Sequence, residues 1–278
     1  MFGRERLKIS GMLMAAVLAF WCCTDLPTST HRSFVPLTLD SLMMANIPSG
    51  TFIQAGHSVI LSSFQISKTE ITQEQYAAIM GLNPSQFNGN ILRPVENVTW
   101  FDAVLFCNAL SKLYSRVTLY TYTAITGSPG NGCTGLANIA MDSSKHGYRL
   151  PTEAEFEYAC RAGTTTVFYW GDSLNKNYFW CRDNSYDSTQ PVGRKLPNSL
   201  GLYDMIGNVL EWCNDRYGPY AVTAQTDPLG SDTGSCRVLR GGYSWNQFTS
   251  YGTNGSASRN YDNPVNIRNN YGFRVVLK

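Results

Sequence analysis

Two carboxylates near position 207 could bind a hard metal cation. Asp204 and Glu211 lie seven residues apart, on either side of a Gly207-Asn208 turn. Two carboxylate ligands, together with the carbonyl oxygens of a turn, suit a cation such as Ca²⁺. The alternative is a purely structural turn in which Glu211 accepts a hydrogen bond from a backbone amide. The sequence thus offers one candidate metal site and leaves both interpretations open.

The cysteines and histidines form no motif for soft-metal or redox chemistry. The three histidines are far apart, and no two cysteines have the Cys-x-x-Cys spacing of a zinc ribbon or a thioredoxin-like site. Six of the eight cysteines lie beyond Cys22 and Cys23, and none lies in residues 237–278. In an exported protein some could pair as disulfides. Cys107 and Cys160 fall within helical patterns and could equally be small buried side chains.

The stretch 243–271 has the composition of a binding surface. Its 29 residues include seven Asn, four Tyr, four Ser, two Gly and two Thr, and neither Lys nor Glu. Tyr offers a large amphipathic contact area at low entropic cost, and Ser, Gly and Asn offer adaptable hydrogen bonds. Asn-rich loops can also be simple turns, but the five residues Tyr243, Phe248, Tyr251, Tyr261 and Tyr271 are too many aromatics for turns alone.

Three helices and several short strands must position these residues. Helix starts are predicted at Thr72, Thr99 and Thr152, each followed three residues later by a side chain that can complete a capping box. Gly81 and Gly163 mark two helix ends. The second helix has a predicted buried face made of Ala103, Phe106, Cys107, Leu110 and Leu113.

The remaining pattern indicates an α+β protein. Short strands are predicted between Met44 and Phe64, at Cys236–Arg240 and at Phe273–Leu277. Residues 121–144 show no periodicity and are expected to form a long excursion. Few helices and much irregular chain favour the α+β class. Arg149 and Glu155 flank the start of the third helix and could form a structural ion pair.

The N-terminus has the features of a targeting segment. A charged stretch is followed by an apolar run, Ile9–Trp21, which is too short to span a bilayer and has the length of a signal-peptide core. Cysteine directly after such a run indicates lipidation, here at Cys22 or Cys23, although Phe20 and Trp21 stand where small residues are usual. An ordinary secretory signal or an uncleaved anchor remains the alternative.

These features give a domain plan and exclude one class of partner. We predict a signal peptide at 1–22, a polar tether at 23–44 and one domain at 45–278, exported and held by lipid at the outer surface of the cell envelope. The net charge is +2, with 22 basic and 20 acidic residues well mixed. A nucleic-acid-binding footprint is therefore not expected.

Four segments together resemble the formylglycine-generating enzyme (sulfatase-modifying factor) domain. They occur in the order of that family and extend over nearly all of residues 48–278, which makes the resemblance specific. The segments are Lys68–Tyr76 (KTEITQEQY), Pro94–Trp100 (PVENVTW), Tyr148–Ala159 (YRLPTEAEFEYA) and Gly201–Trp212 (GLYDMIGNVLEW), followed by Arg240-Gly241-Gly242 and Gly272-Phe273-Arg274.

This resemblance implies a fold, a metal site and an activity. The fold would be a C-type lectin-like α+β fold with little regular secondary structure. The family's calcium site would fall on Asp204, Gly207, Val209 and Glu211, with glycine and valine contributing carbonyls. The enzymes of this family oxidise a substrate cysteine with a copper-bound thiol pair, and here those two positions hold Asn246 and Tyr251. Cu(I) requires soft thiolate ligands, so we expect neither copper nor the family's catalysis.

Related iron-dependent sulfoxide synthases need a histidine cluster, which this chain lacks, so iron is not expected either. An unrelated activity on the same fold stays open.

The C-terminal region also resembles the variable region of diversity-generating retroelement proteins, and the treponeme variable lipoproteins in particular. Leu239–Asn246 (LRGGYSWN) is followed by Asn-rich sequence and by Arg268–Arg274 (RNNYGFR). In that system adenines are the diversified bases, and Asn codons can become those for Tyr, Ser, Thr, Gly, Asp, Ile, Val or Phe. These residue types fill the segment.

We therefore predict a non-catalytic, surface-displayed binding protein with a variable region at 237–278. Its ligand would be a protein or another surface molecule. Trp245 could instead belong to the scaffold. The alternatives are an oxidase or other enzyme on this fold, and an envelope component without a specific ligand. The predicted ligand-binding residues are Tyr243, Trp245, Asn246, Phe248, Tyr251, Asn254, Tyr261, Asn263 and Tyr271.

Overall fold

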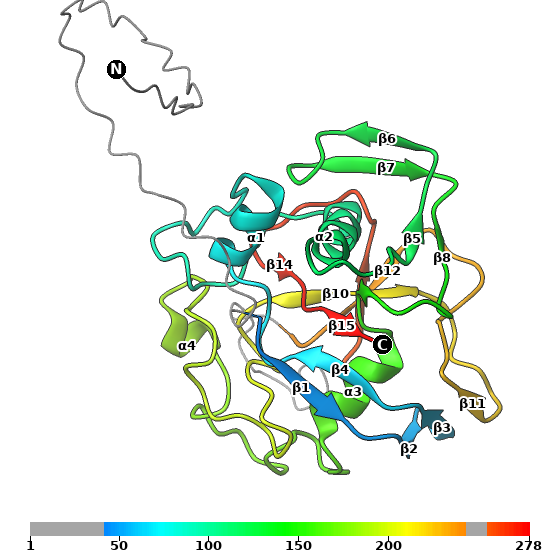
Figure 1. Ribbon diagram of the computed structural model, residues 1–278. Helices are drawn as coiled ribbons and strands as arrows, with labels where there is room; N and C mark the ends of the chain where they lie inside the picture. The colour runs from blue at the N-terminus through cyan, green and yellow to red at the C-terminus, as the bar shows by residue number, and fades with distance from the viewer. Residues whose placement is uncertain (1–41, 243–254) are drawn as a thin grey trace, which may run out of the picture. The chain divides into compact units, whose positions relative to one another are not determined.

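The computed structural model describes residues 42–242 and 255–278, and all positions below refer to these ranges. The signal peptide, most of the tether, and Cys22 and Cys23 lie outside the described residues. The described chain is mixed α and β, as predicted, with short strands, few helices and long connecting loops (Figure 1).

Two four-stranded sheets form the centre of the fold. The first has the order β1-β4-β15-β9 and is antiparallel throughout. The second has the order β13-β12-β10-β14, with β10 and β14 parallel. Their bounds are β1 (Met44–Ile47), β4 (Phe64–Ser67), β9 (Tyr148–Arg149), β15 (Val276–Leu277), β10 (Leu210–Arg216), β12 (Arg237–Arg240), β13 (Asn260–Asp262) and β14 (Tyr271–Gly272).

Three smaller sheets extend from this centre. One has the order β11-β3-β2, and two are the pairs β5-β8 and β6-β7. The β6-β7 pair is an antiparallel hairpin inside residues 121–144, where no element was predicted. Their bounds are β2 (Gly50–Gln54), β3 (His57–Leu61), β5 (Tyr120–Thr121), β6 (Ala124–Gly127), β7 (Cys133–Ala137), β8 (Ala140–Met141) and β11 (Gln225–Thr226).

The helices are α1 (Gln73–Met80), α2 (Trp100–Leu113), α3 (Glu153–Arg161) and α4 (Arg182–Ser185). The three predicted capping boxes are confirmed, with Thr72, Thr99 and Thr152 as N-caps. Helix α3 ends at Arg161, and its C-cap Ala162 adopts the left-handed conformation one residue before the predicted stop at Gly163.

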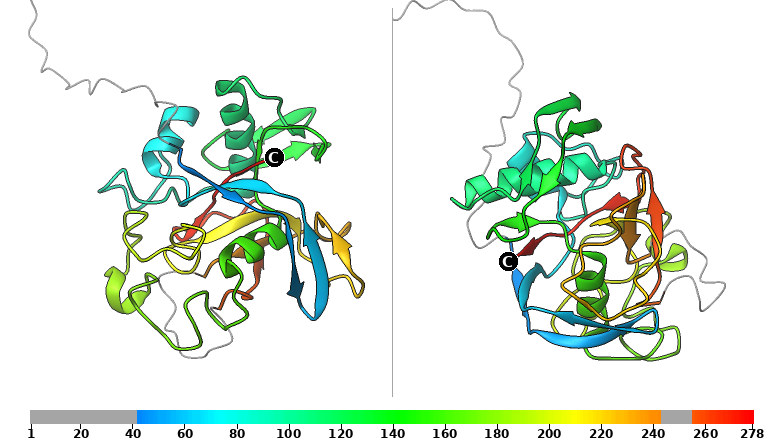
Figure 2. Two further views of the ribbon diagram at one scale, coloured as in Figure 1. Left: turned by 60° about the horizontal axis from the view of Figure 1, so that its bottom comes forward. Right: turned by 90° about the vertical axis from the view of Figure 1, so that its right-hand side faces the viewer.

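Two packed clusters lie on opposite sides of strand β10, one under α2 and one under α3 (Figures 1 and 2). The α2 cluster includes Trp100, Phe106 and Trp212. The α3 cluster includes Phe156 of α3 together with apolar side chains of β1 and β4. Burial of such side chains is the main stabilising contribution to the fold.

The predicted inward face of α2 is right except at its end. Ala103, Phe106, Cys107 and Leu110 are buried, but Leu113, the last residue of the helix, is 58% exposed. No helix in residues 42–242 or 255–278 has the length and apolarity needed to cross a bilayer. The six cysteines of the described chain are all free thiols, and five are buried.

Candidate ligand-binding face

The predicted binding residues that the structure describes lie on or beside sheet β13-β12-β10-β14. Strand β12 is followed by Gly241 and Gly242, both with positive φ, and the later edge strand β13 pairs with β12. Tyr261 of β13 is paired with Val238 of β12. Six further predicted residues lie outside the described residues: Tyr243, Trp245, Asn246, Phe248, Tyr251 and Asn254.

Tyr261 is part of an aromatic and arginine stack. Its side chain is 54% exposed, and its ring stacks on that of Tyr217 with centroids 3.9 Å apart. The guanidinium of Arg259 lies 4.3 Å from the centroid of Tyr217 and 4.2 Å from that of Tyr220. We call these four residues the Tyr261 stack. Such cation–π and ring contacts hold large side chains in place without hiding them from solvent.

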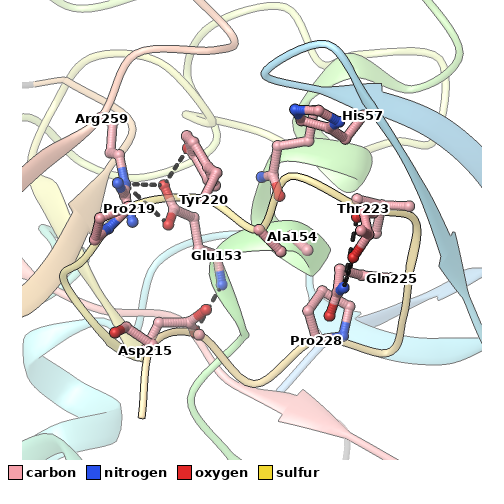
Figure 3. A pocket seen from close by; sticks show the side chains of 15 residues that line it. His57, Glu153, Ala154, Asp215, Pro219, Tyr220, Thr223, Gln225, Pro228 and Arg259 are labelled. Carbon is pink, nitrogen blue, oxygen red and sulfur yellow. Dashed lines mark hydrogen bonds and ion pairs between the residues drawn. The ribbon is translucent and has the colours of Figure 1, made fainter. Parts of the chain in front are cut away.

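Glu153, the first residue of α3, anchors the stack from below. Its carboxylate forms an ion pair with Arg259, with Nε 2.7 Å from Oε1, and accepts a hydrogen bond from the Tyr220 hydroxyl at 2.7 Å (Figure 3). Its backbone N–H donates to Asp215 Oδ2 at 2.9 Å. Burial, and secondly the charge of Glu153, raises the pKa of Asp215 to about 8. Near neutral pH the Asp215 carboxyl is thus mostly protonated, which removes one negative charge beneath the stack.

A small pocket opens beside Glu153, Asp215, Tyr220 and Arg259 (Figure 3). Its volume is about 70 Å³, against the ~30 Å³ that one water molecule occupies in the liquid. It has room for a few water molecules rather than for an organic substrate. We therefore regard it as a small gap beside the stack and not as a substrate site.

A buried ion pair fixes the other end of the same region. Arg240, at the end of β12, is 1% exposed and pairs with Glu157 of α3. It also donates to the carbonyl oxygen of Ser258. The residues before and after the segment 243–254 are thus both tied to α3, through Arg240 on one side and Arg259 on the other.

Tyr271 and Asn263 have different roles from Tyr261. Tyr271 is only 7% exposed; its ring packs against Trp212 at 5.3 Å and its hydroxyl donates to Asp262 at 2.9 Å. It supports the face from inside and is not part of the exposed surface. Asn263 is exposed, but its Oδ1 accepts from Val265 N at 3.2 Å, so its side chain is engaged in a local turn.

The candidate calcium residues are part of a buried charge cluster. Arg274 donates to both oxygens of Glu211, at 2.7 and 2.8 Å, and both side chains are fully buried. Asp204 Oδ2 accepts from Gly193 N at 2.7 Å, while Asp204 Oδ1 and both oxygens of Glu70 have no partner among the described residues. Burial raises the pKa of Asp204 to about 6 and raises that of Glu70 well above its ordinary value.

In this arrangement Glu211 is engaged by a cationic side chain, so the predicted calcium site stays a prediction. The guanidinium of Arg274 takes both oxygens of Glu211. Within the described ranges, no group of three or more Asp, Glu, His or Cys side chains is arranged to hold a metal ion. We therefore derive no metal-dependent step from Asp204, Gly207, Val209 and Glu211.

Part of the face could not be identified from the sequence. Tyr217, Tyr220 and Glu153 were not predicted as site residues, because the first two lie in a Gly- and Pro-containing loop and Glu153 is one residue of a capped helix start. The one sequence signal that Tyr217 and Tyr220 share is that they flank Gly218-Pro219.

The predicted Arg149–Glu155 pair is confirmed, with two hydrogen bonds of 2.6 Å, and is structural.

Comparison with known proteins decides the family. The sulfatase-modifying factor enzyme 1-like domain family (FGE-sulfatase) matches residues 38–278. The chain belongs to this family. It is 41% identical to the formylglycine-generating enzyme of Streptomyces coelicolor, over 79% of this chain and 80% of the enzyme. It is 34% identical to the chaperone protein LppX of Paenibacillus barcinonensis, over 73% and 78% of the two chains.

Solved structures agree with this assignment. Treponema denticola variable protein 1 superimposes with a TM-score of 0.72 at 33% identity, over 84% of this chain and 94% of that protein. CarF matches with a TM-score of 0.65 at 26% identity, over 85% and 98%. The predicted C-type lectin-like fold of the formylglycine-generating-enzyme type is confirmed by these matches, together with the short strands and few helices.

Proposed function

We propose that this member of the sulfatase-modifying factor family is a non-catalytic binding protein, displayed outside the cell, whose residues 237–278 are diversified by a retroelement. The observation that carries the proposal is the structural match to Treponema denticola variable protein 1 at a TM-score of 0.72 and 33% identity. The C-terminal composition, rich in Asn, Tyr, Ser and Gly, points in the same direction.

The anchoring of the region by α3 supports this role. A diversified surface must change its side chains without unfolding, so the backbone at both ends has to be held by residues that do not face the ligand. Arg240 meets this requirement through its buried pair with Glu157, and Arg259, although it belongs to the exposed stack, is held to the same helix by Glu153. Tyr261, stacked on Tyr217, is a rigid aromatic side chain of the kind that contributes most to binding energy.

The absence of a thiol pair speaks against the family's oxidase chemistry. The last cysteine of the chain is Cys236, and the positions expected for the catalytic pair hold Asn246 and Tyr251. Neither an amide nor a phenol replaces a thiolate on Cu(I). The 41% identity to the Streptomyces coelicolor enzyme still favours the oxidase as the second candidate. Turnover of a cysteine-containing substrate peptide by the copper-treated protein would establish it.

The proposed display outside the cell depends on the predicted signal peptide, residues 1–22. We propose that Cys22 or Cys23 is acylated and that the tether, residues 23–44, separates the domain from the membrane. Stable anchoring needs more than one acyl chain. Radiolabelled palmitate should label the wild type, and Cys22→Ala and Cys23→Ala variants should show which thiol carries the lipid. Absence of label from both single variants and the wild type would contradict the anchor.

The first test of the whole proposal is to sequence the locus from many cells of one population, with its downstream DNA. Substitutions confined to adenine-templated codons between Tyr243 and Tyr271, beside a near-identical repeat, are expected. An invariant segment without a repeat would remove the proposed diversification. Recombinant variants from that population should then differ in the surface molecules they bind while keeping the same melting temperature.

A further inference from the structure

Two arginines lie opposite each other on neighbouring strands of one sheet. Arg216, at the end of β10, is paired in register with Arg237, at the start of β12, next to a bulge between the two strands. Both side chains line the same cleft. Like charges directly opposite each other on one face of a sheet are destabilising. Within residues 42–242 and 255–278 neither arginine forms an ion pair with a carboxylate.

Most of the hydrogen-bond donors of these arginines are unused. Arg237 Nη1 donates to the carbonyl oxygen of Asn214 at 2.6 Å, and Arg216 Nη1 donates to that of Asp232 at 2.8 Å. A guanidinium carries five N–H donors in a planar fork. The described contacts leave several donors of each arginine directed to no protein acceptor.

Arg237 is held in one orientation. Its guanidinium lies over the ring of Trp100, 3.7 Å from the centroid, and the indole nitrogen of Trp100 donates to Cys213 O at 2.9 Å. A stacked guanidinium keeps its N–H edges free for an oxyanion. Burial, and next the charge of Arg216, lowers the pKa of Arg237 to about 10, so it stays charged at neutral pH.

An amide adds a third donor. Asn214 Oδ1 accepts from the Tyr120 hydroxyl at 3.0 Å, which directs the Nδ2 group away from Tyr120. Asn214 lines the cleft, and its Nδ2 group donates to none of the described residues. The donors of Arg216, Arg237 and Asn214 thus belong to one cleft.

The rest of the cleft lining is part apolar and part polar. Ile139, Met141 and Leu229 contribute aliphatic surface, and the ring of Tyr120 contributes an aromatic one. One carboxylate, that of Asp232, also lines it, which leaves the lining with one net positive charge. The cleft volume is about 270 Å³, just below the ~300–1,000 Å³ of sites for drug-sized ligands. It suits a small molecule with an anionic head and an apolar body.

We propose that this cleft binds a small organic carboxylate, with its oxygens on Arg216 and Arg237 and its apolar body against Ile139, Met141 and Leu229. A carboxylate matches the guanidinium fork with two parallel hydrogen bonds, and its charge removes the repulsion between the two arginines. The site uses no residue of 243–271, so a failure of this proposal would not affect the proposed diversified binding face, and the reverse also holds.

Phenylacetate is the test ligand, and titration calorimetry on the full-length protein is the measurement. Phenylacetate should bind, while phenethylamine, which has the same ring with a cationic head, should not. Arg216→Gln should weaken binding about tenfold or more, in line with the loss of charge-assisted hydrogen bonds, and Arg237→Gln should do the same. Arg194→Gln, which removes an exposed arginine outside the cleft, is the matched control and should leave binding unchanged.

Three results would overturn the assignment. The first is no detectable binding of phenylacetate by protein that shows a normal melting transition. The second is an equal loss of affinity in the Arg194→Gln control. The third is binding of inorganic phosphate as tightly as phenylacetate, because the apolar wall would then contribute nothing. Arg216 is exposed, so Arg216→Gln is expected to fold normally. The test therefore stays valid even if Arg237→Gln fails to fold.

Discussion

The guanidinium of Arg274 donates to both carboxylate oxygens of Glu211, and neither side chain is exposed to solvent. Arg274 also donates to the backbone carbonyls of Ser67 and Tyr203, so it joins the C-terminal segment to β10, to β4 and to the loop before the Gly207 turn. Removing one member of a buried ion pair leaves the other charge unpaired, which costs far more than the pair itself contributes.

Arg274→Met should therefore lower the free energy of unfolding by about 3–5 kcal/mol, as expected when a buried pair is broken. Arg268→Met is the matched control, because Arg268 pairs with Asp262 at 3.3 Å with its own side chain 56% exposed. Exposed pairs contribute roughly 0–1 kcal/mol. Urea unfolding of both variants measures the difference. Similar losses in the two variants would show that burial of the Arg274–Glu211 pair is not what makes it important.

The same ion pair leads to a prediction about calcium. Because Arg274 occupies both oxygens of Glu211, millimolar CaCl₂ should not raise the melting temperature above that measured in EDTA. Differential scanning calorimetry in the two buffers is sufficient. If calcium does raise the melting temperature and Asp204→Asn abolishes the effect, the ion displaces the guanidinium and the calcium site expected from the family is present in this chain.

Asp215 should make stability depend on pH in a defined direction. Its pKa is about 8 in the folded protein against an ordinary 3.8, so between these values the folded state keeps a proton that the unfolded chain releases. The stability contributed by Asp215 is thus complete below pH 3.8 and is lost as the pH rises toward about 8. In that interval the loss approaches about 1.4 kcal/mol per pH unit, the value for one proton.

Asp215→Asn should remove this component, because the amide does not titrate. Urea unfolding of wild type and variant at several pH values between 5 and 8 gives the free energy of unfolding of each as a function of pH. The wild type should lose stability relative to the variant as the pH rises, by up to about 1.4 kcal/mol per pH unit. Asp232→Asn, which changes an exposed carboxylate, is the control and should run parallel to the wild type. Parallel curves for Asp215→Asn would mean that this carboxyl is already ionised in the folded protein.

Local signals in the sequence were sufficient for the helices. Each capping box uses two residues three positions apart, so Thr72, Thr99 and Thr152 could be recognised without knowing the fold. Helical spacing likewise indicated the buried face of α2, but it could not show that Leu113, at the end of the helix, is exposed. Where a regular pattern reaches the edge of the core is a property of the tertiary structure.

The site depends on pairings that the sequence does not contain. Arg216 and Arg237 are brought opposite each other by a β-bulge, and Tyr217 meets Tyr261 across 44 positions of chain. Composition identified residues 243–271 as a surface but could not separate Tyr261, which is exposed, from Tyr271, which is buried. Burial follows from strand order and register, and both are set by contacts far apart in sequence.

This difference between two tyrosines gives the last prediction. Tyr271→Ala should lower the free energy of unfolding by about 3–5 kcal/mol, since it removes a buried aromatic side chain. Tyr271→Phe, which loses only the hydrogen bond to Asp262, should cost about 1 kcal/mol. Tyr261→Ala removes an exposed ring and its stacking on Tyr217, so its cost should stay within about 1.5 kcal/mol.

Urea unfolding of these three variants separates a framework residue from a surface residue, and binding measurements then complete the comparison. Tyr261→Ala should weaken binding of whatever surface molecule a screen identifies, while Tyr271→Phe should leave that binding unchanged because the Tyr271 ring still packs on Trp212. The opposite result, with binding lost in Tyr271→Phe and kept in Tyr261→Ala, would place the ligand at Tyr271 of β14 instead of at the Tyr261 stack.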